Sequence, residues 1–210
     1  TYSYNYGKNK YYWGYKPQEL KAILEDNNIS SSSGHYDLNK FFDAPEDEMM
    51  KYVDDCIGGA SILKQQYIVW PWLAPEFRSI EQIKILSEKL NKIGERIKKA
   101  NLQLAYHNHD FEFISHNGEL GYDIILKNTD ADLVKMEMDL YWFNHFSKIA
   151  AHEYFLQNPG RFPLWHIKDM DKQNRDLHTV VGDGSIDFKP YFKDAKLAGL
   201  QYMFVEQGNN

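Results

Sequence analysis

The stretch 79–107, SIEQIKILSEKLNKIGERIKKANLQLAYH, places a helix directly before a strand. Ser79 with Gln82 three residues later has the spacing of a capping box, which predicts that the helix begins here. Apolar residues then recur at helical spacing as far as Ala100, namely Ile80, Ile83, Leu86, Leu90, Ile93 and Ile97. Residues 102–107 form a short apolar run that predicts a strand.

The same alternation continues on both sides of this stretch. We expect strands at 29–35, 67–72, 102–107, 133–139, 161–169 and 201–206, and helices at 16–27, 45–66, 79–100, 121–129, 147–158 and 188–198. No linker rich in Pro, Gly or Ser divides the series. Strands that alternate with helices predict an α/β protein with a parallel sheet, and we expect one domain over residues 1–210.

The polar residues near the strand ends favour a closed barrel over an open sheet. No glycine-rich nucleotide-binding motif comes after any predicted strand, as an open nucleotide-binding sheet would require. Instead, His35, His107, His109, Asp139, His166 and Glu206 lie at or near the carboxyl ends of strands. In a (β/α)8 TIM barrel these ends meet at the active site. Such a barrel needs eight strands and typically about 250 residues, so six strands are two short.

Composition excludes several classes of protein. The 24 basic and 30 acidic residues give a net charge of −6, which argues against nucleic acid as a partner. No run of 18 apolar residues predicts a membrane span. The single cysteine, Cys56, has no partner for an internal disulfide. The chain begins at Thr1, so the sequence is compatible with a leader segment that has been removed. The sequence therefore does not decide whether the protein is located in the cytoplasm or in the periplasm.

Four strand ends supply residues suited to a metal. His107 and His109 share one face of an extended segment, and so do His166 and Lys168. With Asp139 and Glu206 these imidazoles resemble a catalytic Zn, Mn or Co site that leaves room for water or substrate. Each residue also has a structural interpretation. A single histidine is commonly a hydrogen-bonded structural residue, Asp139 suits a helix N-cap, and Glu206 suits a solvated surface.

Several motifs resemble the sugar phosphate isomerase/epimerase family of xylose-isomerase-like TIM barrels. They are LNKIGERIKKANLQLAYHNHDFEF (90–113), MDLYWF (138–143), WHIKD (165–169), VGDGSIDF (181–188) and VEQ (205–207). The resemblance implies a divalent metal held by His107, Asp139, His166 and Glu206. Many members have Glu where this chain has His107, so His109 and Glu112 are alternative ligands. Residues 1–7 resemble the family's segment after its second strand, and we therefore expect the first two strands and the last helix to be missing from the chain.

The resemblance also implies an activity, the isomerisation or epimerisation of a sugar. A carboxylate would remove a proton next to a carbonyl and return it, by way of an enediolate. Glu206 is the first candidate for this base. Lys168 would stabilise developing negative charge, although an ion pair with Asp169 or Glu206 is an alternative role for it. Alternation along the strand places Glu137 on the same face as Asp139 but one layer deeper in the barrel, away from its mouth. We expect Glu137 to pair with a buried Lys or Arg.

We expect the partner to be a small-molecule carbohydrate. The sequence does not decide whether the protein forms a homo-oligomer. Candidate substrate-binding residues are His35, Trp70, His109, Tyr141 and Trp142, although aromatic residues in such places also serve as packing. The arginines are scattered, so a neutral sugar, keto-sugar or inositol-like polyol fits better than a sugar phosphate. Alternatives are a lyase or dehydratase on the same site, a non-catalytic sugar-binding protein, and a DNA repair endonuclease, which the acidic charge disfavours.

Overall fold

A computed structural model describes residues 6–208, with the backbone alone at Gly7 and Lys8. The chain divides into two compact units. The first comprises the described residues up to Tyr106 together with Lys127–Val134. The second comprises His107–Leu126 together with the described residues from Lys135 onward. Among residues 6–208, no helix is long and apolar enough to cross a membrane.

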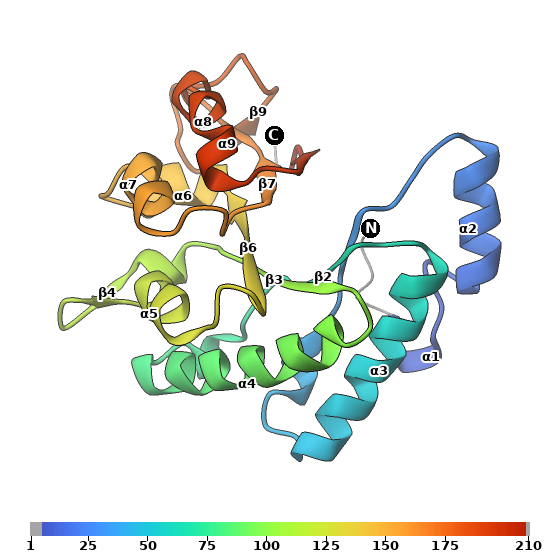
Figure 1. Ribbon diagram of the computed structural model, residues 1–210. Helices are drawn as coiled ribbons and strands as arrows, with labels where there is room; N and C mark the ends of the chain where they lie inside the picture. Colours follow the sequence, from blue (N-terminus) through green and yellow to red (C-terminus); the bar gives the residue numbers. More distant parts are fainter. Residues whose placement is uncertain (1–5, 209–210) are drawn as a thin grey trace. The chain divides into compact units, whose positions relative to one another are not determined.

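The first unit is a parallel sheet with helices, as the alternation predicts (Figure 1). Its elements are α1 (Tyr6–Asn9), α2 (Pro17–Asp26), β1 (Ser33–His35), the 3-10 helix η1 (Leu38–Phe41), α3 (Glu46–Ile62), β2 (Tyr67–Trp70), the 3-10 helix η2 (Pro75–Phe77), α4 (Ile80–Lys98) and β3 (Gln103–His107), whose last residue belongs to the second unit. Strand β2 pairs in parallel with β1 on one side and with β3 on the other. All four residues of β2 are buried, so both faces of this strand are covered.

Helix α4 forms where its sequence predicts. The Ser79 hydroxyl accepts a hydrogen bond from the Gln82 backbone N–H at 3.3 Å, which caps the helix. The predicted apolar stripe is buried along the whole helix. Gly94 is needed because a Cβ there would lie 2.8 Å from the Leu133 carbonyl oxygen. Helices α3 and α4 lie side by side (Figure 1), and Arg96 pairs with Asp54 across them at 2.7 Å.

The second unit also contains three parallel strands. Its elements are the 3-10 helix η3 (Phe111–Phe113), β4 (Ser115–His116), β5 (Glu119–Leu120), α5 (Gly121–Asn128), β6 (Val134–Asp139), α6 (Leu140–Phe146), α7 (Ala151–Gln157), β7 (Leu164–Ile167), β8 (Asp169–Met170), β9 (His178–Thr179), α8 (Lys189–Lys193), α9 (Ala195–Ala198) and β10 (Tyr202–Val205). The first residue of β6 and the last two of α5 belong to the first unit. Strand β7 lies between β6 and β10, with Asp139 opposite His166 and His166 opposite Phe204. This register places the ends of the three strands together.

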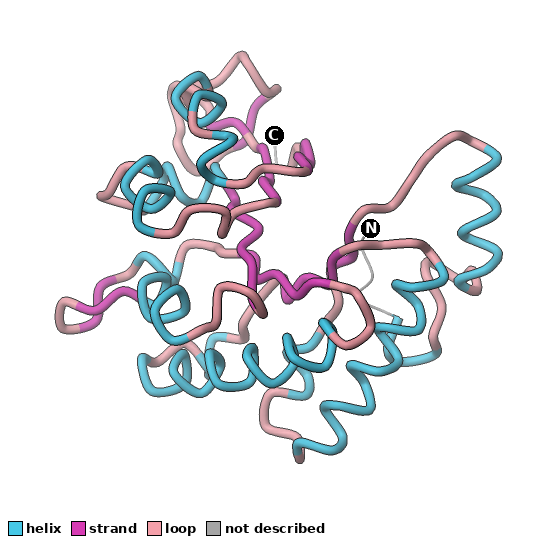
Figure 2. The backbone as a smooth tube through the Cα atoms, in the orientation of Figure 1, coloured by secondary structure: helices cyan, strands magenta, loops and turns pink. Residues whose placement is uncertain are grey.

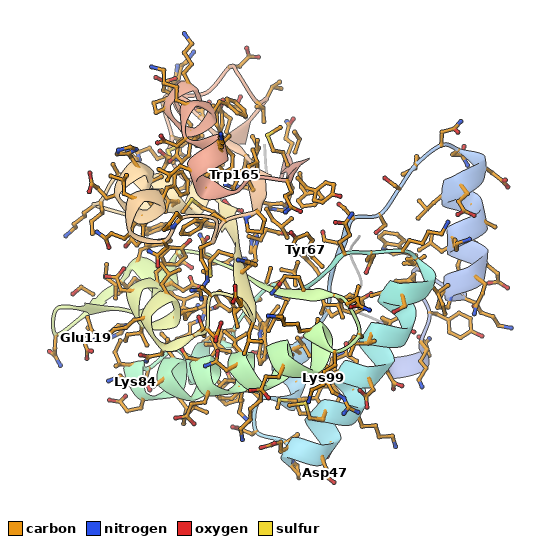
Figure 3. All side chains as sticks on the ribbon, viewed as in Figure 1. Asp47, Tyr67, Lys84, Lys99, Glu119 and Trp165 are labelled. Carbon is orange, nitrogen blue, oxygen red and sulfur yellow. The ribbon has the colours of Figure 1, made fainter. Side chains whose placement is uncertain are left out.

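Aromatic residues fill the core of the second unit. Trp165 on β7, which is labelled in Figure 3, is fully buried. It stacks on Phe155 of α7, with ring centroids 5.8 Å apart. Tyr191 of α8 contacts the same indole edge-on. The high aromatic content therefore serves packing to a large extent.

Several predicted elements differ in their bounds; the helix expected at 45–66, for example, ends at Ile62. Side-chain hydrogen bonds explain two of these differences. Gln65, which is distant in sequence, binds Ser31 and the Ser33 carbonyl where β1 (Ser33–His35) begins. Ser147 bonds locally to Ile149, so α7 starts at Ala151. Residues 188–198 form two short helices that meet at Asp194, which has a ψ of 2°. Residues 161–169 give the four-residue strand β7, and Asp169 belongs to β8, which pairs with β9 instead (Figure 2).

Candidate active site

Five predicted polar residues come together at the strand ends of the second unit. His107 ends β3, Asp139 ends β6, His166 lies in β7 with Lys168 two residues later, and Glu206 comes directly after β10. His107, Asp139 and His166 each offer a ligand atom within 4.8 Å of those of the other two. Parallel strands end at the same edge of a sheet, which explains why residues so distant in sequence meet. The structure thus brings these five residues together, and their roles in the site stay predictions.

Asp139 is the centre of the cluster and is fully buried. Its Oδ1 accepts the backbone N–H groups of Tyr141 and Trp142 at 2.9 and 3.0 Å and so caps helix α6. Its Oδ2 lies 3.0 Å from Lys168 Nζ, 3.4 Å from His166 Nδ1 and 3.7 Å from His107 Nε2. The N-cap role and the site role are therefore held by different oxygens of one carboxylate.

Glu206 completes the cluster from the side of β10. Its Oε2 lies 3.2 Å from His166 Nδ1 and 3.3 Å from Lys168 Nζ. The Glu206 side chain is 45% exposed, whereas that of Asp139 is fully buried. Lys168 thus pairs with Asp139 and Glu206, while the adjacent Asp169 points into a loop. Of the Asp139 and Glu206 carboxylates, only that of Glu206 is exposed enough for a small molecule to reach it.

His107 is oriented by a second buried carboxylate. Its Nδ1 lies 3.0 Å from Glu137 Oε1, and Glu137 is fully buried. Glu137 thereby holds a histidine of the cluster, and its expected pairing with a buried Lys or Arg stays a prediction. The contact with His107 directs the other ring nitrogen, Nε2, toward Asp139, as carboxylate partners do for metal-binding histidines. Burial lowers the pKa of His107 to about 3, more than the hydrogen bond to Glu137 raises it, so the ring is neutral.

Opposing effects set the other pKa values in the cluster. Burial alone would raise the pKa of Asp139, but the hydrogen bond with His166 and the charge of Lys168 hold it below its ordinary value. Burial alone would lower the pKa values of His166 and Lys168, but Asp139 raises both above their ordinary values. At neutral pH the cluster therefore contains an ionised carboxylate beside an ammonium group.

His109 and Glu112 lie next to the cluster. The rings of His107 and His109 are 4.9 Å apart, and His109 is 6.1 Å from the indole of Trp142. The buried Glu112 carboxylate accepts the backbone N–H of His109 at 2.9 Å. This bond gives Glu112 a structural task, while His109 and Trp142, both half-buried, stay predicted substrate-binding residues.

Two further predicted substrate-binding residues belong to the first unit. His35 is the last residue of β1 and is half-buried. Trp70 is the last residue of β2, is fully buried, and donates from its indole N–H to the Trp72 carbonyl at 2.7 Å. It also contacts Phe42 edge-on, as a core residue does. Their contact with substrate stays a prediction.

His178 of β9 was not singled out by the sequence, because no motif or spacing marks it. Its ring contacts that of Tyr141 edge-on, with centroids 4.4 Å apart. Its Nδ1 accepts the backbone N–H of Gly208 at 3.1 Å. Burial, together with the nearby charge of Lys168, lowers its pKa, which favours the neutral ring.

Asp169 anchors the loop that precedes α8. Its buried carboxylate accepts backbone N–H groups from Met170, Gly182, Gly184 and Ile186 at 2.8 to 3.2 Å. A Cβ at Gly184 would overlap this carboxyl group, so a glycine is needed there. The VGDGSIDF motif thus owes its second glycine to a close approach of the backbone to a carboxylate.

Removing this anchor should destabilise the protein. Asp169→Ala leaves four backbone N–H groups without their acceptor, and we expect the free energy of unfolding to fall by about 2–4 kcal/mol. Asp171→Ala is the matched control, because Asp171 accepts two N–H groups on an exposed turn and should cost at most about 1 kcal/mol. Urea unfolding measures both, and equal losses would show that Asp169 is no special anchor.

The cluster fits a divalent metal by its donor set and its spacing. Two ligands bound at about 2.1 Å to one tetrahedral ion lie about 3.4 Å apart. Asp139 Oδ2 lies 3.4 Å from His166 Nδ1 and 3.7 Å from His107 Nε2, and Glu206 Oε2 lies 3.2 Å from His166 Nδ1. The two imidazoles and the Asp139 carboxylate form a group that could hold an ion such as Zn²⁺, Mn²⁺ or Co²⁺, and Glu206 as a further ligand stays a prediction.

Comparison with known families identifies the class of fold. A family model described as "Xylose isomerase-like TIM barrel" matches residues 4–208. The chain belongs to this family. The predicted TIM-barrel class is thereby confirmed, and the family explains why polar residues collect at the carboxyl ends of the strands.

Individual relatives carry two kinds of name. An inosose dehydratase of Clostridium perfringens is 30% identical over an alignment 131 residues long, and the match covers 54% of this chain and 42% of that protein. The chain thus spans less than half the length of this curated relative. A sugar phosphate isomerase/epimerase structure from Parabacteroides distasonis is 27% identical, with a TM-score of 0.75 over 92% of this chain and 68% of that chain. A second structure of that name and organism gives a TM-score of 0.82 at 23% identity, covering 100% of this chain and 78% of that chain.

Proposed function

We propose that the chain is the catalytic part of a metal-dependent sugar isomerase or epimerase, which removes a proton next to a carbonyl group. The observation that supports this most is the reachable Glu206 carboxylate beside Asp139, His166 and Lys168 in one cluster. The substrate is a neutral sugar, keto-sugar or polyol, a small-molecule carbohydrate.

The metal would be held by His107, Asp139, His166 and Glu206. When bound, a divalent ion supplies Lewis-acid polarisation of the substrate carbonyl. His107 presents Nε2 because Glu137 holds its other nitrogen, and Asp139 presents Oδ2 because α6 holds its other oxygen. These contacts hold the donor atoms in place before a substrate arrives.

Glu206 is the proposed base. Its exposed carboxylate accepts the proton from the substrate carbon, the electron pair of that C–H bond forms the enediolate, and return of the proton to carbon gives the isomer or epimer. Lys168, kept protonated by Asp139 and Glu206, stabilises the negative charge on the enediolate oxygen. Trp142 and His109 would bind the apolar and polar faces of the substrate.

A dehydratase is the second candidate, and the name of the relatives favours it. The inosose dehydratases are up to 30% identical to this chain. The first step would be the same removal of a proton by Glu206. The electron pair would then expel the hydroxyl group from the neighbouring carbon, and a proton from Lys168 would let it leave as water. The site can therefore serve either outcome after one common step.

Product analysis tests the proposal and separates its two forms. The chain is incubated with inosose and with a panel of ketohexoses, with and without EDTA, and the products are examined by NMR and mass spectrometry. We expect turnover that EDTA abolishes and Mn²⁺, Co²⁺ or Zn²⁺ restores. A product of unchanged mass indicates an isomerase or epimerase, and a product lighter by one water indicates a dehydratase. Binding without any product would show a sugar-binding protein and contradict the proposal.

A further inference from the structure

The segment after Glu206 is tied to another part of the second unit by His178. The Gly208 backbone N–H, two residues after Glu206, donates to His178 Nδ1 at 3.1 Å. A Cβ at Gly208 would lie 2.6 Å from the same nitrogen, so the chain passes directly against the ring. Figure 1 shows β9 close to the end of the described chain.

The His178 ring is itself held from two other sides. Strand β9 pairs with β8, and Met170 lies opposite His178 in the register. Tyr141, two residues after Asp139, packs edge-on against the ring, and its hydroxyl donates to the Arg175 carbonyl at 2.7 Å. His178 therefore links the segment after Glu206 to the helix that begins next to Asp139.

The loop beyond β9 makes this support rigid. Asp169, next to Lys168 in sequence, binds four backbone N–H groups, three of them from Gly182, Gly184 and Ile186. Asp169 is itself a residue of β8, the strand that pairs with β9. Both ends of the segment that carries His178 are thus fixed to β8.

We propose that His178 is a positioning residue for Glu206, which acts by holding the backbone of residues 206–208 through Gly208. The inference rests on the proposed function, because it assigns Glu206 to the metal and to the proton. Without the contact at Gly208, the Glu206 carboxylate would sample more orientations, and partners of this kind change metal affinity or activity by about 10–100-fold when they are removed.

Two substitutions separate the hydrogen bond from the bulk of the ring. His178→Asn keeps an acceptor, Oδ1, near the place of Nδ1, whereas His178→Leu keeps volume but has no acceptor. His152→Leu is the control, because His152 pairs with Asp194 on helices that carry no residue of the cluster. The 210-residue chain is used throughout, and circular dichroism verifies that each variant is folded.

Three readouts report on the contact, the ion and the reaction. They are hydrogen exchange of the Gly208 amide by NMR, the affinity for Mn²⁺ by calorimetry, and kcat with KM. In His178→Leu we expect faster exchange of the Gly208 amide, Mn²⁺ affinity weaker by about 10-fold or more, and a fall in kcat larger than the rise in KM. His178→Asn should stay within about threefold of the original chain in all three, as should His152→Leu.

The outcomes distinguish the two proposals. A wild-type chain that binds Mn²⁺ and turns substrate over, with His178→Leu equal to it in affinity and kcat, overturns the positioning role alone. Equal losses in His178→Asn and His178→Leu also overturn it, because the acceptor would then be irrelevant. A wild-type chain that neither binds Mn²⁺ nor turns over any substrate overturns the proposed function.

Discussion

Replacing Glu206 by Gln should lower kcat by about 10²–10⁴-fold, the usual contribution of a general acid or base. Glutamine keeps the size of the side chain but cannot take a proton from carbon. Lys168 Nζ lies 3.3 Å from Glu206 Oε2, so the amide oxygen can still accept a hydrogen bond and the cluster should stay assembled. Steady-state kinetics on the active substrate measures the effect.

Glu153→Gln is the matched control for this substitution. Glu153 lies in the first turn of α7 and is exposed, so the same chemical change there should leave kcat unaltered. Because Glu206 is also a proposed ligand, metal content must be measured in the same preparation. If the ion stays bound and kcat equals that of the wild type, Glu206 is not the base, and His109 becomes the next candidate.

Substitution of Asp139 or His166 should empty the metal site. We expect about one Zn²⁺, Mn²⁺ or Co²⁺ per wild-type chain by elemental analysis, and a small fraction of that in His166→Ala and in Asp139→Ala. Both residues contribute atoms spaced as ligands of one ion, so loss of either removes a direct contact with the metal. Activity should fall in parallel.

The N-cap role of Asp139 calls for a second variant. Asp139→Ala also removes the acceptor for Tyr141 and Trp142 and would cost about 1 kcal/mol at the start of α6. Asp139→Asn keeps that acceptor while removing the negative charge, so loss of the metal in Asn isolates the ligand role. His152→Ala should retain the full metal content. Full occupancy in the Asn and His166→Ala variants would rule out the metal assignment.

The sequence predicts helices and strands well where the spacing of the apolar residues and the capping residues indicate the same bounds. Helix α4 lies within two residues of its expected bounds because Ser79, the buried stripe and the turn after Lys98 all act in the same direction. The prediction fails where polar contacts between residues distant in sequence compete with the local pattern. Gln65 binds Ser31 and Ser33, and Asp194 pairs with His152 at the point where the last predicted helix breaks.

The candidate site shows a similar limit. Strand ends carry a regular signal in an alternating α/β chain, which placed His107, Asp139, His166 and Glu206 among the candidates, and the family resemblance then selected these four. The contacts that support these residues leave no such signal in the sequence, because their partners meet only in the folded chain. They are the contacts of Glu137 with His107, of Asp169 with its loop, and of His178 with Gly208. The expectation of a single domain and the roles of the individual site residues stay predictions.

Release of label from a deuterated substrate tests the central claim most directly. The substrate identified by product analysis is prepared with deuterium on the carbon next to the carbonyl, and the fate of the label during turnover is monitored by NMR. Removal of a proton by Glu206 predicts that the label passes to solvent water, at a rate that Glu206→Gln lowers together with kcat. Product that retains the label in full would indicate transfer of hydride between carbons and would contradict the account.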